Sequence, residues 1–147
     1  MLEDYWSPQL YDPLLYEGLL FAAGGTFHQG IPKYDRATGT SYSRGLNLGD
    51  LISRVFPIYA HIAPAITHGL CGYGFTLTVG GALGHYFYNS PSLVPFIIGF
   101  TLCSIVGVLE IVSDVKLKKT SLCDILQWIA DFSGPLAALI RAYHLLF

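Results

Sequence analysis

The stretch that decides the fold is residues 55–109, which read VFPIYAHIAPAITHGLCGYGFTLTVGGALGHYFYNSPSLVPFIIGFTLCSIVGVL. It contains no Asp, Glu, Lys or Arg, and it is bounded by Arg54 and Glu110. A bilayer core is about 30 Å thick, and a helix needs about 20 apolar residues to cross it. The run is therefore long enough for two crossings, which divide at the short uncharged turn of residues 88–92.

The composition of the whole chain agrees with this interpretation. Of its 147 residues, 52% are hydrophobic and only 12% are charged, whereas typical soluble domains are about 25% charged. A soluble enzyme is therefore a poor candidate. The net charge of −2 offers no surface for phosphates, so we expect no nucleic-acid partner. The three cysteines form no C-x-x-C motif, and we expect no zinc site.

We predict an all-α integral membrane protein with three transmembrane helices. Residues 54–147 form the transmembrane domain, with crossings at about residues 56–86, 93–113 and 122–143. Residues 1–53 carry mixed charges and are predicted to form an N-terminal extramembrane arm. Within the arm, apolar residues at helical spacing predict a short interfacial helix over residues 13–23, too short to span. Residues 30–45, rich in Gly, Ser, Thr and Tyr, are expected to form an ordered loop.

Basic residues orient these crossings. One group precedes the first crossing, a second group follows the second crossing, and the turn between the crossings has none. The positive-inside rule then puts both groups and the N-terminus on a cytoplasmic or matrix face. The residues concerned are Lys33, Arg36, Arg44 and Arg54 in the first group and Lys116, Lys118 and Lys119 in the second.

Small residues predict where the helices pack. Gly80 and Gly84 form a G-x-x-x-G motif on the first crossing, and Gly99, Cys103 and Gly107 repeat this spacing on the second. Lipid provides no hydrophobic drive between helices, so they associate by close approach at small residues. We expect these glycines to face neighbouring helices of this chain or of a partner.

Polar residues within the crossings are the candidate functional groups. His61 and His68 are seven positions apart, so they share one face of a helix. Each is a structural, hydrogen-bonded histidine, a group that contacts quinone or handles protons, or a haem ligand. Asp131 and Arg141 are ten positions apart, too far for a direct pair on one straight helix. Either their helix packs against other subunits, or they form an ion or proton site.

Two stretches of the chain carry a resemblance to a known family. Residues 65–72, AITHGLCG, and residues 107–114, GVLEIVSD, resemble two motifs of the large membrane-anchor subunit of succinate dehydrogenase (respiratory complex II). The resemblance implies a soluble N-terminal arm, three transmembrane helices, and ubiquinone or haem b near His68. Ala65 and Gly69 replace the serine and arginine of the first motif, and Cys103 stands at the position of the haem ligand. This chain would therefore be a divergent anchor whose quinone and haem roles are lost or moved to other subunits.

Together these patterns predict a non-catalytic membrane-anchor or structural subunit of a multi-subunit respiratory, energy-transducing complex, with complex II as the candidate. We expect no enzyme activity of the chain alone, although the complex would be an oxidoreductase of the electron-transport chain. The expected location is the mitochondrial inner membrane, with the N-terminus in the matrix and with bound lipid. Ubiquinone or haem b would be supplied at a subunit interface. The alternatives are a small homo-oligomeric transporter or channel and a membrane assembly factor.

Overall fold

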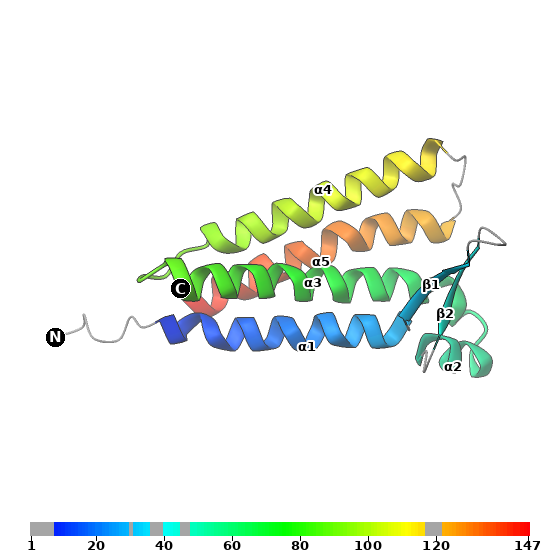
Figure 1. Cartoon of the computed structure of the whole chain (residues 1–147), viewed down its shortest axis with the longest axis horizontal. Coiled ribbons are helices and arrows are strands. Elements are labelled where there is room, and N and C mark those ends of the chain that lie inside the picture. The colour runs from blue at the N-terminus through cyan, green and yellow to red at the C-terminus, as the bar shows by residue number, and fades with distance from the viewer. Residues whose placement is uncertain (1–7, 30, 36–39, 45–47, 117–121) are drawn as a thin grey trace.

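The computed structural model describes residues 8–29, 31–35, 40–44, 48–116 and 122–147. Four long helices, α1, α3, α4 and α5, lie side by side, and each runs antiparallel to the next in the chain (Figure 1). The fold is therefore helical, as predicted. The elements in chain order are the 3₁₀ turn η2 (Pro8–Tyr11), α1 (Asp12–Gln29), β1 (Ile31–Asp35), β2 (Thr40–Arg44), α2 (Leu48–Val55), α3 (Tyr59–Phe87), α4 (Val94–Lys116) and α5 (Leu122–Leu146).

The crossings predicted from the sequence correspond to α3, α4 and α5, with boundaries shifted by a few residues. A turn at residues 56–58 precedes α3. Pro64 lies inside α3. It falls in the second turn of the helix, where a proline removes a single backbone donor.

The N-terminal helix is longer than predicted and lies elsewhere. α1 continues through Gly24 and Gly25 to Gln29. It runs along α3, whereas the prediction was a short helix at the membrane interface (Figure 1). Glycine is a weak helix former, but tertiary contacts outweigh its cost here. Gly25 lies against Leu70 and Cys71 of α3, so close that a side chain at this position would collide with the Cys71 sulfur.

The loop expected at residues 30–45 contains a β-hairpin. Strands β1 and β2 are antiparallel, with Ile31 opposite Arg44 and Asp35 opposite Thr40. Ile, Tyr and Thr in this stretch favour extended structure. The hairpin and α2 lie together at one end of the bundle (Figure 1).

The two predicted basic groups lie at the same end of the bundle. The end that carries the hairpin and α2 also carries the C-terminal end of α4, at Lys116 (Figure 1). The described basic residues of both groups are thus at this end, whereas Arg36, Lys118 and Lys119 lie outside the described residues. Tyr11 is at the opposite end, where its buried hydroxyl donates a hydrogen bond of 2.7 Å to the Ser90 carbonyl. The start of α1 is therefore not at the basic end, which differs from our expectation for the N-terminal arm.

The bundle has a small core. The fully buried cluster consists of seven residues, and four of them are alanine or aromatic: Tyr11, Leu14, Leu77, Phe96, Ala138, Ala142 and Leu146. Burial raises the pKa of the Tyr11 phenol, so this hydroxyl stays a donor.

Among the described residues, α4 is the one helix whose length and composition alone suit a membrane crossing, and 17% of its most apolar window is buried within the chain.

Candidate functional site

Glycines let α3 approach its neighbours closely enough to build a site between them. A Cβ atom on Gly134 of α5 would collide with the Gly69 carbonyl of α3, and one on Gly74 of α3 would collide with the α1 backbone at Ala22. Each contact therefore requires the absence of a side chain. Backbones that approach in this way bring the polar groups of adjacent helices within hydrogen-bond distance.

The four glycines singled out in the sequence all lie at interhelical contacts. A Cβ on Gly80 would overlap the Phe96 ring of α4, and one on Gly84 would overlap the Tyr11 ring. On α4, a Cβ on Gly99 would lie 2.9 Å from the Thr76 carbonyl oxygen of α3. A Cβ on Gly107 would lie 3.2 Å from the Cβ of Asp131 on α5.

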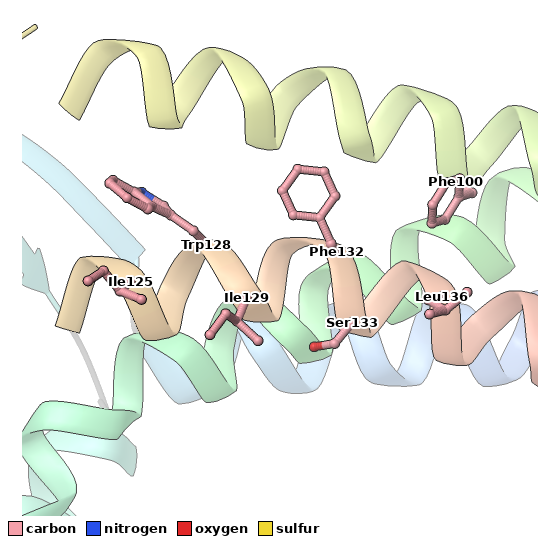
Figure 2. A pocket seen from close by; sticks show the side chains of 7 residues that line it. All are labelled: Phe100, Ile125, Trp128, Ile129, Phe132, Ser133 and Leu136. Carbon is pink, nitrogen blue, oxygen red and sulfur yellow. The ribbon is translucent and has the colours of Figure 1, made fainter. Parts of the chain in front are cut away.

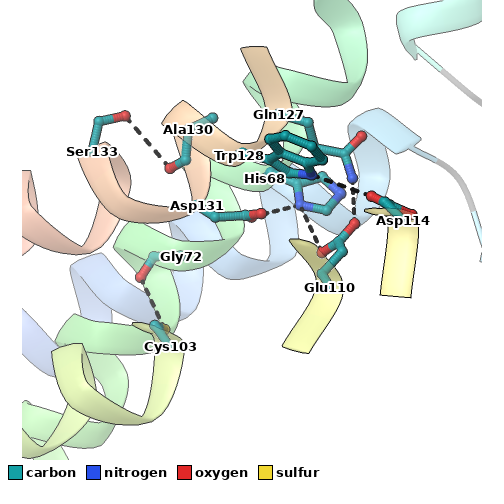
Figure 3. A network of polar contacts seen from close by, with 10 residues as sticks. All are labelled: His68, Gly72, Cys103, Glu110, Asp114, Gln127, Trp128, Ala130, Asp131 and Ser133. Carbon is teal, nitrogen blue, oxygen red and sulfur yellow. Dashed lines mark hydrogen bonds and ion pairs between the residues drawn. The ribbon is translucent and has the colours of Figure 1, made fainter. Parts of the chain in front are cut away.

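His68, Glu110 and Asp131 converge where α3, α4 and α5 meet (Figure 3). The His68 Nδ1 lies 2.7 Å from the Asp131 Oδ1 and 3.8 Å from the Glu110 Oε2. The three side chains come from three different helices, and one ligand atom from each lies within 4.8 Å of the others. We call these residues the His68 cluster.

One side chain outside the cluster holds Glu110 in place. The Gln127 amide donates a hydrogen bond to the Glu110 Oε1, which leaves Oε2 directed toward His68 (Figure 3). One turn further along α4, the Trp128 Nε1 donates to the Asp114 Oδ2 at 3.2 Å. The Asp131 Oδ2 is buried and has no hydrogen-bond partner among the described residues. Burying a carboxylate oxygen without a partner is costly, so a hydrogen-bond donor or a cation beside this oxygen would stabilise the cluster.

A cavity of about 580 Å³ opens onto the His68 cluster. Small-molecule sites commonly have volumes of about 300–1,000 Å³, so this cavity is large enough for water molecules or part of a ligand. Apart from the cluster itself, its walls are mainly apolar or contain sulfur: Thr67, Cys71, Gly72, Phe75, Leu102, Cys103, Ile105 and Val106.

Of the two cysteines in the cavity wall, Cys103 forms hydrogen bonds with α3. The Cys103 thiol donates to the Gly72 carbonyl at 3.8 Å and accepts a hydrogen bond from Thr76 at 3.6 Å. Haem b held between helices generally needs two axial ligands, but His68 is the one histidine among the described residues lining this cavity. The residues present therefore do not fit haem held by two histidines. The side chain of His61 lies outside the part that the structure describes.

A second hollow lies between α4 and α5 and is almost wholly apolar. Figure 2 shows its lining residues, with the Phe132 ring and the Trp128 indole directed toward α4. Its volume is about 540 Å³. It has no group suited to chemistry and fits an acyl chain or an apolar side chain. The lining residues are Phe100, Ile125, Trp128, Ile129, Phe132, Ser133 and Leu136.

Asp131 and Arg141, both predicted to be buried on α5, have partners on other helices. The Asp131 side chain is largely buried, whereas that of Arg141 is 41% exposed, which differs from the prediction. Asp131 pairs with His68, and the Arg141 guanidinium pairs with Glu17 of α1 through contacts of 3.1 to 3.3 Å. The Tyr73 hydroxyl donates a further hydrogen bond of 2.5 Å to Glu17. As expected from their spacing, the two α5 residues do not pair with each other.

Two further histidines also have interhelical partners. The His85 Nδ1 lies 2.6 Å from the Asp12 Oδ1, near the end of the bundle at which Tyr11 lies. The two ring nitrogens of His28 lie 2.7 Å from the Thr67 and Tyr59 hydroxyl oxygens. These contacts tie α1 to α3 at both ends.

Sequence reasoning missed Glu110 and Glu17 as members of the polar contacts. Glu110 was noted only as the boundary of the charge-free run, although it is the one charged residue of the predicted crossing at residues 93–113. An ionisable residue at the edge of a span is by itself a signal for a functional or paired group. Glu17 was assigned to an extramembrane arm, so no partner was sought for it.

No protein family, no curated protein and no solved structure was found to match this chain.

Proposed function

We propose that this chain is an integral membrane subunit that anchors and packs within a larger energy-transducing complex of the respiratory chain, without catalytic activity of its own. The observation that supports this proposal is the distribution of apolar and charged side chains between the surface and the interior. Apolar side chains face outward, and the charged groups of the helices pair inward. Such a pattern suits a protein whose solvent is lipid.

The outward faces of α4 and α5 carry the first half of this observation. Large aliphatic residues are exposed along both helices, including Val106 and Leu109, each 63% exposed, and Ile129, 59% exposed. Soluble monomers rarely expose contiguous apolar patches of more than a few hundred Å². The exposed apolar residues of these two helices therefore suit contact with lipid or with other subunits.

Inward pairing of charge is the second half. Asp12 pairs with His85, Glu17 with Arg141, and Asp131 with His68. Ionisable groups within membranes are costly, face the bundle interior and pair with one another. All three pairs join different helices, so they also hold the bundle together.

The proposal keeps the three predicted crossings, α3, α4 and α5, and adds α1, which runs along α3 from one end of the bundle to the other, as a fourth segment within the membrane. Under the positive-inside rule the end with the hairpin, α2 and Lys116 belongs on the matrix side of the mitochondrial inner membrane. The start of α1, at the opposite end, is then expected on the other side. Reporters that distinguish the two sides test this orientation.

A partner is part of the proposal because the chain buries little of itself. The small core and the apolar hollow between α4 and α5 leave side chains such as Ile125 and Phe132 for other molecules to cover. Bound lipid and neighbouring subunits both meet this need. Complex II is the complex to which the sequence resemblance points, and ubiquinone would then bind at a subunit interface.

Native gel electrophoresis of the tagged chain tests the proposal. Membranes are washed with alkaline carbonate, solubilised in mild detergent and resolved, and the band that holds the chain is assayed for oxidoreductase activity. We expect the chain to resist carbonate and to migrate with a large oxidoreductase. Release by carbonate would contradict membrane integration, and migration as a small homogeneous oligomer would contradict the subunit role.

One observation favours a second candidate, a small homo-oligomeric transporter or channel. The His68 cluster contains two carboxylates and opens to a cavity, which an anchor does not require. Purified chain reconstituted into vesicles distinguishes the two functions. Cation or proton flux that is lost in Asp131→Asn would favour transport, whereas the anchor role predicts no flux from the chain alone.

A further inference from the structure

The geometry points to a binding site for one divalent first-row transition-metal ion, held by the His68 Nδ1, the Glu110 Oε2 and one oxygen of Asp131. This inference is independent of the anchor role, because nothing in that role requires a metal. It rests on the distances between the ligand atoms, the unpartnered oxygen of Asp131, the net charge of the cluster and the cavity beside it.

The ligand atoms are spaced for one ion. Zn²⁺ binds nitrogen and oxygen ligands at about 2.0–2.2 Å, so neighbouring ligands of a tetrahedral site are about 3.3 Å apart. The two measured separations from the His68 Nδ1 are 2.7 Å to Asp131 and 3.8 Å to Glu110. They lie on either side of that value, so rotations of the side chains alone would close the site around an ion.

The oxygen of Asp131 that has no partner among the described residues is a second feature that favours metal binding. The Asp131 Oδ1 is engaged by His68, but its Oδ2 is buried without a partner. A metal ion accepts lone pairs from both oxygens of one carboxylate or from either of them. Binding would therefore satisfy an atom that the described protein groups leave unsatisfied.

Charge balance favours a dication. With both carboxylates ionised and His68 neutral, its proton on Nε2 so that the lone pair of Nδ1 is free for the ion, the cluster carries a charge of −2, which a divalent ion cancels. A neutral site is the least costly state among the apolar walls of this cavity. The chemistry of the ligands narrows the choice further. Imidazole favours zinc and iron over magnesium and calcium, and carboxylates accommodate manganese as well.

The surroundings resemble those of a metal site with an open position. Gln127 holds the far oxygen of Glu110, as second-layer groups do when they orient metal ligands. The cavity lies beside the three protein ligands, so a water molecule or a small anion can occupy the fourth position. The site is therefore suited to a bound water as well as to structural cross-linking of α3, α4 and α5.

The test is metal titration of the purified full-length chain in detergent micelles. Zn²⁺ binding is measured by calorimetry after chelator treatment, and Co²⁺ binding by its visible absorption. We expect one ion per chain and no displacement by excess Mg²⁺ or Ca²⁺. His68→Gln, Glu110→Gln and Asp131→Asn should each weaken binding at least 100-fold, and Gln127→Ala about 10- to 100-fold.

Matched controls separate the cluster from its neighbours. Asp114→Asn removes a carboxylate one turn from Glu110, and Asp12→Asn removes the carboxylate of the other His–Asp pair. Both should bind Zn²⁺ within about threefold of the parent chain, because neither supplies a ligand. Replacement of Cys71 and Cys103 by serine should also leave binding unchanged, and the Co²⁺ spectrum should lack a thiolate charge-transfer band.

Three results would overturn the site. They are no binding by the parent chain, equal losses in Asp114→Asn and Glu110→Gln, and dependence on the cysteines. Far-UV circular dichroism checks that each variant keeps its helices. If the single variants unfold, the Co²⁺ spectrum of the parent chain decides alone, since a four-coordinate site of one nitrogen, two carboxylates and water gives visible bands clearly more intense than those of hydrated Co²⁺ and no thiolate band. A spectrum identical to that of hydrated Co²⁺ would also overturn the site.

Discussion

The pair formed by Glu17 and Arg141 joins residues 124 positions apart and tests whether the bundle lies in lipid. The Glu17 carboxylate accepts the Arg141 Nε at 3.3 and 3.2 Å and the Nη2 at 3.1 Å, in addition to the Tyr73 hydroxyl. The two side chains are 23% and 41% exposed. We consider the effect of Glu17→Gln, which keeps the shape and removes the charge.

The environment sets the size of the effect. Removal of one member of a buried ion pair costs about 3–5 kcal/mol, because the other charge is left uncompensated. A pair exposed to water contributes about 0.2–1 kcal/mol. The guanidinium of Arg141 is partly exposed and can extend toward the headgroups, so we expect Glu17→Gln to lower the free energy of unfolding by about 2–3 kcal/mol.

A double-mutant cycle measures the pair itself. Unfolding of the chain in mixed micelles is followed by far-UV circular dichroism during titration with SDS, for Glu17→Gln, Arg141→Met and the double variant. The expected coupling free energy is about 1–2 kcal/mol. Lys116→Gln, which removes an exposed charge at the end of α4, is the control and should change the free energy of unfolding by less than about 0.5 kcal/mol.

Salt dependence provides the refuting result. A coupling below about 0.3 kcal/mol that disappears at high salt would mean that the pair faces water. The charged groups would then be ordinary groups on a water-exposed surface, and the pairing of charges would no longer support the placement of these helices in a membrane.

Three further predictions concern packing, topology and the end of the bundle. Gly134→Ala should lower the free energy of unfolding by about 1–3 kcal/mol, because the added Cβ would collide with the backbone of α3. Gly24→Ala should raise the free energy of unfolding by about 0.5–1 kcal/mol, because Gly24 lies in open space and alanine is the better helix former. Equal effects of the two substitutions would contradict the packing. Reporters fused after Asn89 and after Lys119 should report opposite sides of the membrane, and the same side for both would exclude the three-span topology. Tyr11→Phe should cost about 0.5–1.5 kcal/mol of unfolding free energy through loss of its buried hydrogen bond, and an unchanged melting temperature would count against that bond.

Much of the helical layout follows from local patterns, and for that reason it was predictable. The charge-free run of residues 55–109 and the turn at residues 88–92 predict α3 and α4 closely. The length of an apolar run and the presence of turn residues depend only on residues close together in the chain. The limits of α1 were less predictable. Glycine is a weak helix former, and the contacts of Gly25 and His28 with α3 stabilise this part of α1.

The candidate site was only half visible in the sequence. His68 and Asp131 were singled out as isolated costly residues, but nothing in their local pattern indicates that they meet, since they are 63 positions apart. Glu110 joins them through a third helix. The spacing Gly18-x-x-x-Ala22 on α1 was a usable signal for close packing on α3, because small residues four positions apart share one helix face.

The sequence by itself determined the positions of the helices α3, α4 and α5, and that Asp131 and Arg141 would need partners. Hydropathy and side-chain periodicity are properties of neighbouring residues, so they can be read without the fold. The tertiary structure alone decided which partner each charge has and that α1 lies along α3. Those choices depend on glycine contacts between helices far apart in the chain, where a single methyl group decides whether two backbones meet.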